Sequence, residues 1–451
     1  MFDPIDPQHG SGWTLYHSEC VAQMRAMPEN SVDCIVTDPP YHLTSIQKRY
    51  GGTDIGRDGT NETRARNRSD AMGRLAGGFM GKSWDGGDVA FRVETWQAAI
   101  RVLKPGGYIF AFASTRGYHR MACAIEDAGF ITHPLIGWCF GNGFPKATNA
   151  SRMIDALLKS GKTRTEDLRR LEMGENYVPS GRGRVNYDYG VGSSMDRTPN
   201  GYVPTSPEAA EWDGWYYGGK VRKPALEPIY VGQKPFSERN GALNILKWGV
   251  GAVNIDGCRV EAVQSTVRKN RAEMGYHGGN LLGEYMTGSD LGRWPANLMH
   301  DGSPEVLALF PTVKARANRG DSAGKGATPD EVYAGGWNDL DCGARYNRDD
   351  PDIREGSAAR FFNCYPPDIP PLIYSPKASK ADRAGSRHPT VKPQKLMRDI
   401  IKHGTPPGCT VLDPFAGTGS TLQAAIAEGR NAIGIEADVT SILDTVRRLR
   451  Q

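Results

Sequence analysis

The feature that most constrains the fold lies near the end of the chain, where an apolar run, a glycine turn and an apolar helix pattern follow one another. Residues 410–421 read Thr-Val-Leu-Asp-Pro-Phe-Ala-Gly-Thr-Gly-Ser-Thr. Residues 422–426 then place apolar side chains on one helix face, and Gly429 is expected to end that helix. This order of strand, turn and helix is typical of a parallel sheet covered by helices.

The glycine turn itself suits a bound ligand. Gly417 and Gly419 have no side chains, so a ligand can approach their backbone closely. Ser420 and Thr421 are expected to cap the helix, whose free N–H groups create a positive potential. The next strand ends at Glu436, and an acidic residue there suits two ribose hydroxyls. The alternative is a strand–turn–helix unit without a ligand, which the position of Glu436 argues against.

A second motif, Asp38-Pro39-Pro40-Tyr41, follows the apolar run of residues 32–37. It combines a carboxylate, a rigid backbone and an aromatic face at the end of a buried strand. These parts suit an enzyme that holds a planar amine and presents its nitrogen to an electrophile. The alternative interpretation is a strand that the proline pair ends in an extended turn.

Together the two motifs resemble the S-adenosylmethionine-dependent amino methyltransferases of DNA. Asp-Pro-Pro-Tyr precedes the glycine motif, an order that resembles the β class, and shorter stretches resemble phage and prophage members. Residues 388–393, His-Pro-Thr-Val-Lys-Pro, are similar to a segment that this class places against the cofactor. The resemblance implies an α/β fold, namely a circularly permuted Rossmann-like methyltransferase fold. Its sheet would be doubly wound and mostly parallel, with an inserted target-recognition region.

The resemblance also implies the site residues. The catalytic residues would be Asp38, Pro39, Pro40 and Tyr41, and the cofactor would be S-adenosylmethionine, leaving as S-adenosylhomocysteine, with no metal. The cofactor-binding positions would be Asp413, Phe415, Ala416, Gly417, Thr418, Gly419, Ser420, Thr421, Glu436, His388, Thr390, Lys392, Glu19 and Cys20. Glu19-Cys20 stands where the family often has Asp-Cys, which keeps the carboxylate but lengthens its side chain.

The expected reaction is methyl transfer to N6 of adenine in double-stranded DNA. The adenine amine is a poor nucleophile and is stacked inside the duplex, so the base must be flipped out. Asp38 and a backbone carbonyl of Pro39 or Pro40 would accept the two N–H bonds, and Tyr41 would stack on the ring. The methyl group would then transfer directly, without a covalent enzyme–base intermediate, and the proton would leave to Asp38 or to water.

Three alternatives stay open. The acceptor could be N4 of cytosine, although such enzymes more often carry Ser in the place of Asp38. It could be a glutamine amide of a protein, although the similar enzymes place the glycine motif first. The chain could also be a non-catalytic DNA-binding regulator, against which the intact Asp38, Tyr41 and Asp413 argue.

Residues 42–82 form a basic, glycine-rich segment without apolar periodicity. The net charge of the whole chain is only +4, so local charge is more informative than global charge. We expect a lid that contacts DNA phosphates and orders on binding, with an ordinary disordered insertion as the alternative. The candidate DNA-binding residues are Lys48, Arg49, Arg64, Arg66, Arg68 and Arg74.

Four regions are expected along the chain. Residues 1–150 would form the N-terminal half of the methyltransferase domain, with strands at 13–16, 32–37 and 108–113, helices at 21–27, 89–103 and 114–127, and a turn at 104–107. Residues 151–235 would hold a helical insertion, including a helix at 151–172, and a return strand at 226–231. Residues 236–385, loop-rich with scattered tryptophan and arginine, would be the target-recognition region. Residues 386–451 would form the C-terminal half.

The remaining expectations concern metals, location and partners. The eight cysteines form no Cys-x-x-Cys pair, which argues against a zinc site. The sequence has neither a signal-peptide pattern nor an apolar run long enough to span a membrane, which favours the cytoplasm. The resemblance implies a bacterial or phage-encoded, nucleoid-associated homodimer. The sequence shows no nuclease motif, which favours a methyltransferase without a restriction partner.

Overall fold

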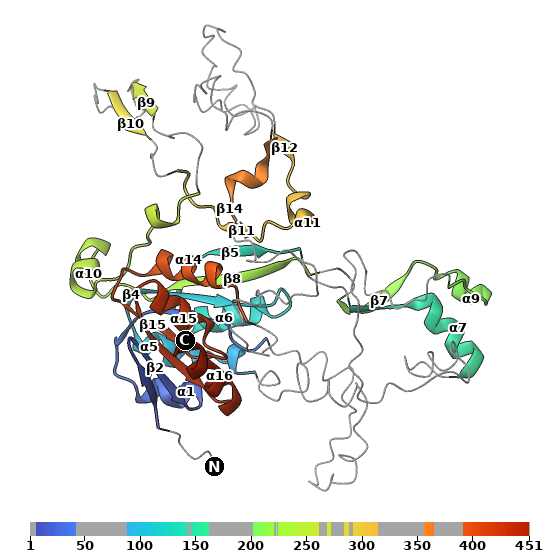
Figure 1. Ribbon diagram of the computed structural model, residues 1–451, viewed down its shortest axis with the longest axis horizontal. Coiled ribbons are helices and arrows are strands. Elements are labelled where there is room, and N and C mark those ends of the chain that lie inside the picture. The colour runs from blue at the N-terminus through green and yellow to red at the C-terminus, as the bar shows by residue number, and fades with distance from the viewer. Residues whose placement is uncertain are drawn as a thin grey trace.

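The computed structural model describes residues 6–41, 88–141, 146–161, 202–220, 222, 224–260, 268–271, 284–287, 292–313, 356–364 and 391–450. In these residues the largest element is a ten-stranded sheet with the order β1-β2-β16-β15-β3-β4-β8-β5-β11-β14 (Figure 1). Its strands are β1 (Gln8–Gly10), β2 (Trp13–His17), β3 (Val32–Thr37), β4 (Leu103–Phe112), β5 (Ile131–Cys139), β8 (Leu226–Gln233), β11 (Leu298–His300), β14 (Asn363–Cys364), β15 (Thr410–Asp413) and β16 (Asn431–Glu436). Three separate two-stranded pairs are β6 (Lys146–Asn149) with β7 (Tyr216–Lys220), β9 (Arg268–Arg271) with β10 (Glu284–Thr287), and β12 (Thr312–Val313) with β13 (Gly356–Ser357).

The helices connect and cover these strands. The α-helices are α1 (Cys20–Ala26), α5 (Val93–Val102), α6 (Tyr118–Asp127), α7 (Ala150–Ser160), α9 (Pro207–Ala210), α10 (Gly241–Trp248), α11 (Pro304–Leu307), α14 (Gln394–Gly404), α15 (Ser420–Ala427) and α16 (Val439–Leu449). Short 3-10 helices are η3 (Val89–Phe91), η5 (Asp256–Cys258) and η8 (Ala358–Phe361). No helix in the part of the chain that the structure describes is long and apolar enough to cross a membrane.

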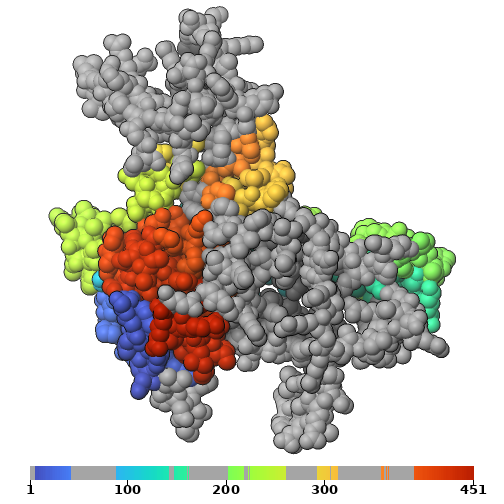
Figure 2. Space-filling model, viewed as in Figure 1, coloured from blue at the N-terminus to red at the C-terminus, as the bar shows by residue number. Residues whose placement is uncertain are grey.

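The two ends of the chain build one sheet together. Strand β15 pairs in parallel with β3, and β16 pairs in parallel with β2, so the C-terminal strands lie between two N-terminal ones. The N-terminal and C-terminal segments therefore lie side by side on one face of the molecule (Figure 2). Strand β8 runs antiparallel to both of its neighbours, β4 and β5, and β1 is antiparallel to β2. The expected mostly parallel α/β sheet is confirmed.

The central strands β3 and β15 are buried on both faces of the sheet, and their successive side chains point to opposite faces. In β3, Cys34 and Val36 pack into a core that includes residues of α14, α15 and α16, whereas Ile35 packs with residues of α1, α5 and α6 on the opposite face. Strand β15 repeats this alternation with Val411 and Leu412. Two helical layers thus enclose the sheet, and this arrangement fixes the strand ends that carry the two motifs.

Several expected boundaries in the N-terminal half were wrong. The helix expected at 89–103 is divided, because Arg92 has an extended backbone between η3 and α5. Residues 104–107, expected as a turn before the strand at 108–113, lie inside β4 with an irregular register: Val32 pairs with Leu103 and Cys34 with Tyr108. The helix expected to begin at Ser114 begins at Tyr118, since residues 114–117 form a turn first.

The middle of the chain also differs from the expectation. The helix expected at 151–172 ends at Ser160, because Gly161 adopts a left-handed conformation (φ 65°) and caps it. Strand β8 confirms the return strand that was expected at 226–231. Within the region expected to be loop-rich, β11 and β14 extend the main sheet beyond β5 in parallel. Their two or three residues give too short a pattern to be recognised in the sequence.

Candidate active site

The two motifs meet because they follow neighbouring parallel strands. Asp38 lies just after β3, and the glycine turn follows β15, so both stand at the carboxyl edge of the sheet, where ligands of open α/β sheets bind. Thr37 Oγ1 donates a hydrogen bond of 2.7 Å to Asp413 Oδ1. Thr421 Oγ1 donates to the other oxygen at 2.6 Å, and the Phe415 amide donates to Oδ1 at 3.1 Å. Asp413 therefore ties the two strand ends together.

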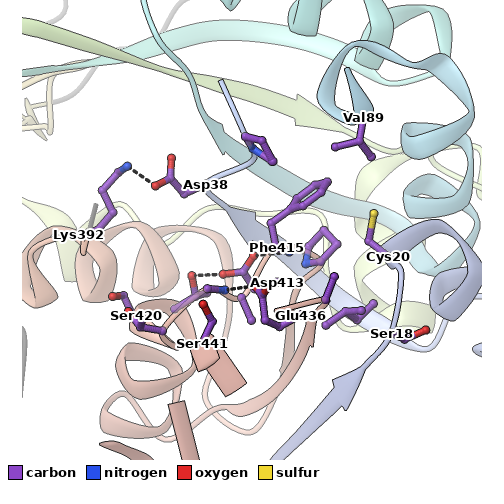
Figure 3. A pocket seen from close by; sticks show the side chains of 18 of the residues that line it. Ser18, Cys20, Asp38, Val89, Lys392, Asp413, Phe415, Ser420, Glu436 and Ser441 are labelled. Carbon is purple, nitrogen blue, oxygen red and sulfur yellow. Dashed lines mark hydrogen bonds and ion pairs between the residues drawn. The ribbon is translucent and has the colours of Figure 1, made fainter. Parts of the chain in front are cut away.

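A cavity of about 270 Å³ opens at this edge (Figure 3). The expected site residues that line it are Glu19, Cys20, Asp38, Pro40, Lys392, Asp413, Phe415, Ala416, Gly417, Thr418, Ser420, Thr421 and Glu436. Residues that were not named as site residues also line it: Val391 and Pro414, which belong to the two quoted motifs, and Ser18, Val89, Met397, Ile435, Ala437 and Ser441. One cavity thus joins the carboxylate of Asp38 to the glycine turn.

The glycine turn has the backbone that only glycine adopts readily. Gly417 and Gly419 have φ values of 54° and 77°. Gly419 is the N-cap of α15 and makes no side-chain capping bond, so the expected capping by Ser420 or Thr421 was wrong: both lie inside the helix. A Cβ atom on Gly419 would lie 2.6 Å from Thr445 Cγ2, so this turn packs tightly against α16.

Side chains of helix α16 form hydrogen bonds with the glycine turn and the start of α15. Thr445 Oγ1 donates to the carbonyl oxygen of Gly417 at 2.9 Å. The guanidinium of Arg448, 2% exposed, donates to Thr418 Oγ1 at 3.1 Å and to Gln423 Oε1 at 2.8 Å. Sequence reasoning missed both residues, because α16 carries no motif and its contacts with the turn are not local.

Glu436 also holds the glycine turn, through hydrogen bonds to its carboxylate. Its carboxylate accepts the Gly417 amide at 2.7 Å and the Asp438 amide at 2.8 Å. Burial raises the pKa of Glu436 to about 7, although these amides favour its ionised form. Burial likewise raises the pKa of Asp413 to about 6, against the donors that it accepts. Two carboxyl groups of this cavity therefore titrate near neutral pH.

Glu19 and Cys20 lie where α1 begins and line the cavity; Cys20 is labelled in Figure 3. Glu19 is the N-cap of α1, and its carboxylate accepts the Ala22 amide at 2.8 Å. The Cys20 thiol donates to the same carboxylate at 3.3 Å, and burial raises the pKa of this thiol. The glutamate that departs from the family pattern is thus a helix cap with its carboxylate at the cavity wall.

Asp38 belongs to a cluster of four polar side chains, which we call the Asp38 cluster: Asp38, Tyr41, Glu227 and Lys392. The Lys392 ammonium forms an ion pair with Asp38 Oδ2 and a second one with Glu227 Oε1 at 3.2 Å. The Tyr41 hydroxyl contacts both carboxylates, lying 2.8 Å from Asp38 Oδ1. Lys392 is 4% exposed and Glu227 is 2% exposed, so their charges face each other away from water.

The charge states in this cluster follow from its burial. Burial lowers the pKa of Lys392, but the charges of Asp38 and Glu227 outweigh it, so the net shift is upward and the ammonium stays charged. Burial and the same two carboxylates raise the pKa of Tyr41 well above its ordinary value, so the phenol stays neutral. The ammonium also lies 4.9 Å from the centre of the Phe112 ring, a favourable cation–π distance.

The sequence predicted that Lys392 binds the cofactor, and it did not indicate Glu227 as a site residue. Lys392 does line the cavity, but its ammonium points to Asp38 (Figure 3). Glu227 occupies β8, whose next six residues are all buried. An acidic residue in such an apolar strand is a signal of a buried partner that was available in the sequence.

Some expected site residues fall outside the described part of the chain: His388, Thr390, Lys48, Arg49, Arg64, Arg66, Arg68 and Arg74. Pro39 and Tyr41 are described but are not part of the cavity wall. Among the described residues, no group of three or more His, Cys, Asp or Glu side chains could hold a metal ion.

Comparison with known proteins gives a family and several partial relatives. The model of the N6/N4 family, described as DNA methylase, matches residues 32–443. The chain is 50% identical over 62 residues to the DNA adenine methyltransferase YhdJ of Escherichia coli K12, covering 14% of this chain and 21% of that protein. The chain spans less than half the length of six curated relatives that it matches.

Solved structures with a likeness over most of the chain have low identity. The M1.HpyAVI–SAM complex is 14% identical with a TM-score of 0.36, covering 97% of this chain and 100% of that one. The cytosine-N4-specific PvuII DNA methyltransferase is 12% identical with a TM-score of 0.36, covering 97% of this chain and 86% of that one.

Proposed function

We propose that this chain, which belongs to the N6/N4 DNA methylase family, transfers a methyl group from S-adenosylmethionine to N6 of an adenine flipped out of double-stranded DNA. The observation that carries the proposal is the single cavity lined by both Asp38 and the glycine turn. A methyl donor and its acceptor nitrogen must be almost in contact, and here the motifs assigned to each open into the same space.

The residues around the turn fit the proposed cofactor. Gly417 lines the cavity and leaves space beside its backbone, and the Glu436 carboxylate at the cavity wall is an acceptor for two hydroxyl groups of a ribose. Phe415, Val89 and Ile435 add apolar wall, which suits a purine ring and a methionine chain. When bound, S-adenosylmethionine supplies a methyl group on a sulfonium, which an amine can take directly.

On the acceptor side, the residues hold and polarise an amine. Asp38 Oδ1 and the backbone carbonyl of Pro39 or Pro40 would accept the two N–H bonds, which favours a pyramidal nitrogen and stabilises its developing positive charge. The ring of Tyr41 would stack on the base. The Lys392 ammonium fixes the orientation of Asp38, since it holds the second carboxylate oxygen.

Cytosine N4 is the alternative acceptor. Both bases present a planar exocyclic amine, and the Asp38 cluster can hold either one. We favour adenine because the cytosine enzymes that the sequence resembles more often carry Ser in the place of Asp38. A non-catalytic regulator is the weaker alternative, because the motifs for both donor and acceptor are complete.

The proposal also covers how the chain is divided into regions. The strands that carry the cofactor motif, β15 and β16, come last in the chain yet lie between β2 and β3, which supports a circularly permuted domain. We propose that residues 236–385 supply target recognition, that residues 42–82 contact DNA phosphates, and that the enzyme acts as a homodimer.

The test uses the full chain, duplex DNA of mixed sequence and isotopically labelled S-adenosylmethionine. Digestion to nucleosides and mass spectrometry should reveal labelled N6-methyladenine. Labelled N4-methylcytosine in its place would select the alternative base, and no labelled nucleoside with several duplexes would contradict the proposal. Asp38→Ala should abolish transfer while S-adenosylmethionine affinity stays close to that of the wild type.

A further inference from the structure

We propose that Glu227 accepts, by way of Tyr41, the proton that the acceptor amine releases during methyl transfer. This inference rests on the proposed function and adds a residue to it. The sequence left the proton with Asp38 or with water, and the structure adds Glu227, in contact with Tyr41 and Lys392, as a further acceptor. Its position behind Asp38, away from the cavity, points to a role in receiving the proton rather than in touching the base.

The Asp38 cluster is a connected path from the cavity into the protein. Asp38 lines the cavity, whereas Tyr41 and Glu227 do not. The Tyr41 hydroxyl lies between Asp38 Oδ1, at 2.8 Å, and Glu227 Oε1, with which it is in direct contact. Lys392 Nζ is 3.2 Å from the Tyr41 hydroxyl and from Glu227 Oε1, and it contacts Asp38 Oδ2. Each successive atom is within hydrogen-bond reach of the next.

Counting hydrogens shows that this path has a place for one more proton. The Tyr41 hydroxyl has a single hydrogen, yet it faces a carboxylate oxygen on each side. Ionised carboxylates only accept hydrogen bonds, so Tyr41 can donate to Asp38 or to Glu227 but not to both. If Glu227 carries a proton, it donates to Tyr41 while Tyr41 donates to Asp38, and both contacts become hydrogen bonds.

The charge of the cluster favours the same uptake. The two carboxylates and one ammonium of the Asp38 cluster carry charges that sum to −1 when all three are ionised, and both Glu227 and Lys392 are almost fully buried. A buried net charge is unfavourable, and one proton neutralises it. The upward shift of the Tyr41 pKa keeps the phenol protonated, so Tyr41 conducts the proton without ionising.

The proton moves from the amine to Asp38 and then through Tyr41 to Glu227. As the new bond from nitrogen to the methyl carbon forms, the amine nitrogen becomes positively charged. One N–H bond then breaks, its electron pair stays on nitrogen, and the proton forms an O–H bond on Asp38. Asp38 passes a proton to the Tyr41 oxygen while Tyr41 passes its own hydrogen to Glu227 Oε1. Asp38 is a carboxylate again, the methylated amine is neutral, and Glu227 is a neutral carboxylic acid.

Glu227 lies in β8, between β4 and β5. Its cross-strand partner in β5 is Trp138, and on the β4 side the Ala113 amide donates to the carbonyl of the next residue, Pro228. The titratable side chains of Tyr41 and Lys392 contact Glu227 directly. A pH effect that both Glu227→Gln and Tyr41→Phe remove can therefore be assigned to this cluster.

The experiment compares the wild type with Glu227→Gln and a matched control, Asp33→Asn. Asp33 is also a buried carboxylate paired with a lysine, Lys104 at 2.6 Å, but it lies at the opposite end of β3. Single-turnover methyl transfer to duplex DNA is measured against pH, together with S-adenosylmethionine affinity. Infrared difference spectra of the unliganded proteins between acid and neutral pH then show whether a carboxylic acid band belongs to Glu227.

Glu227→Gln should lower the rate of methyl transfer by roughly 10²-fold, the size of a general-base contribution, and leave S-adenosylmethionine affinity unchanged. The pH at which the rate of methyl transfer falls should shift in this variant. A carboxylic acid band should also disappear from its infrared difference spectrum. Asp33→Asn should keep both the wild-type pH profile and that band. Tyr41→Phe, which keeps the ring but breaks the path, should show the same loss of rate, and the double variant should be no slower than either single one.

The outcomes separate this inference from the proposed function. A wild-type protein that methylates no DNA contradicts the proposed function itself. If the wild type is active and Glu227→Gln has the same rate and the same fall in rate at acid pH, the proton path alone is overturned. A slower Glu227→Gln variant whose pH profile and infrared spectrum match the wild type would also overturn it, because the residue would then act only on structure.

Discussion

Thr37 and Asp413 are joined by a hydrogen bond of 2.7 Å, although 376 positions separate them in the chain. The hydroxyl of Thr37 stands directly before the Asp-Pro-Pro-Tyr motif, and the Asp413 carboxylate begins the glycine motif. Both side chains are buried. This bond fixes the spacing of the two strand ends, and with it the spacing of the amine site and the cofactor turn.

The first prediction concerns that bond. Thr37→Val keeps the shape of the side chain but removes its hydroxyl, so Asp413 Oδ1 loses a buried donor. We expect a loss of about 1–3 kcal/mol in the free energy of unfolding, measured by urea denaturation. Thr132→Val is the control, because Thr132 is exposed and its hydroxyl is hydrogen-bonded to Tyr230 in the neighbouring strand β8. A loss in Thr37→Val no larger than in this control would show that the bond contributes little.

The second prediction is a dependence of stability on pH through Asp413. Burial raises its pKa in the folded state from 3.8 to about 6, so the folded protein binds more protons than the unfolded chain between these values. The free energy of unfolding should therefore fall as pH rises from about 4 to about 6, by on the order of 3 kcal/mol at most. Asp413→Asn should flatten this part of the curve in urea denaturation series.

The pKa of Glu436 works in the same direction between 4.5 and about 7, so it adds to the fall in the wild type. The Asp413 contribution is thus the difference between the wild-type and Asp413→Asn curves. Two parallel curves over this range would mean that Asp413 is ionised in the folded protein at its ordinary pKa.

The third prediction concerns S-adenosylmethionine affinity and Glu436. Hydroxyl donors bind an ionised carboxylate best, and burial raises the pKa of Glu436 to about 7. Affinity should therefore decrease as pH falls below about 7, and binding in that range should release a proton. Calorimetry in buffers with different ionisation enthalpies measures both quantities.

Glu436→Gln should bind S-adenosylmethionine more weakly and release less of this proton. Glu428→Gln is the matched control, since Glu428 pairs with Arg398 and is not part of the cavity wall. Equal proton release in the wild type and Glu436→Gln would assign the titration to another group, of which Asp413 is the candidate in the same cavity.

The sequence correctly predicted several strands and the glycine turn, which local patterns determine. Buried apolar runs identified β3, β4, β8, β15 and β16, and the glycines identified the turn, because these signals lie within a few residues of the element. The contacts that the sequence did not predict are nonlocal. The ion pair between Lys392 and Asp38 spans 354 positions, and the pattern around Lys392 carries no information on where its ammonium points.

The predicted start of helix α15 was wrong for a related reason. Ser420 has the chemistry of a cap, but the left-handed conformation of Gly419 moves the helix start by one residue. The packing of Gly419 against α16, which lies later in the chain, makes that conformation necessary. A capping preference of about 1 kcal/mol is too small to compete with a buried contact of this kind.

The last prediction tests that packing. Gly419→Ala combines two costs: a left-handed backbone at φ 77°, and a Cβ atom 2.6 Å from Thr445 Cγ2. Gly429→Ala carries only the first, because φ is 72° and no atom lies within 4 Å of the added Cβ. We expect Gly429→Ala to cost about 1 kcal/mol of unfolding free energy and Gly419→Ala to cost about 1–3 kcal/mol more.

Thr445→Ser separates the two costs within Gly419→Ala itself. Serine removes the Cγ2 atom but keeps the hydroxyl that donates to Gly417, so the turn stays bonded to α16. Measured by urea denaturation, Gly419→Ala should therefore cost less in a Thr445→Ser background than in the wild type. The S-adenosylmethionine affinity of the double variant should recover in parallel, because the same displacement would distort both the helix contact and the cofactor turn. An equal cost in both backgrounds would show that the backbone conformation, not the contact with Thr445, requires glycine at position 419.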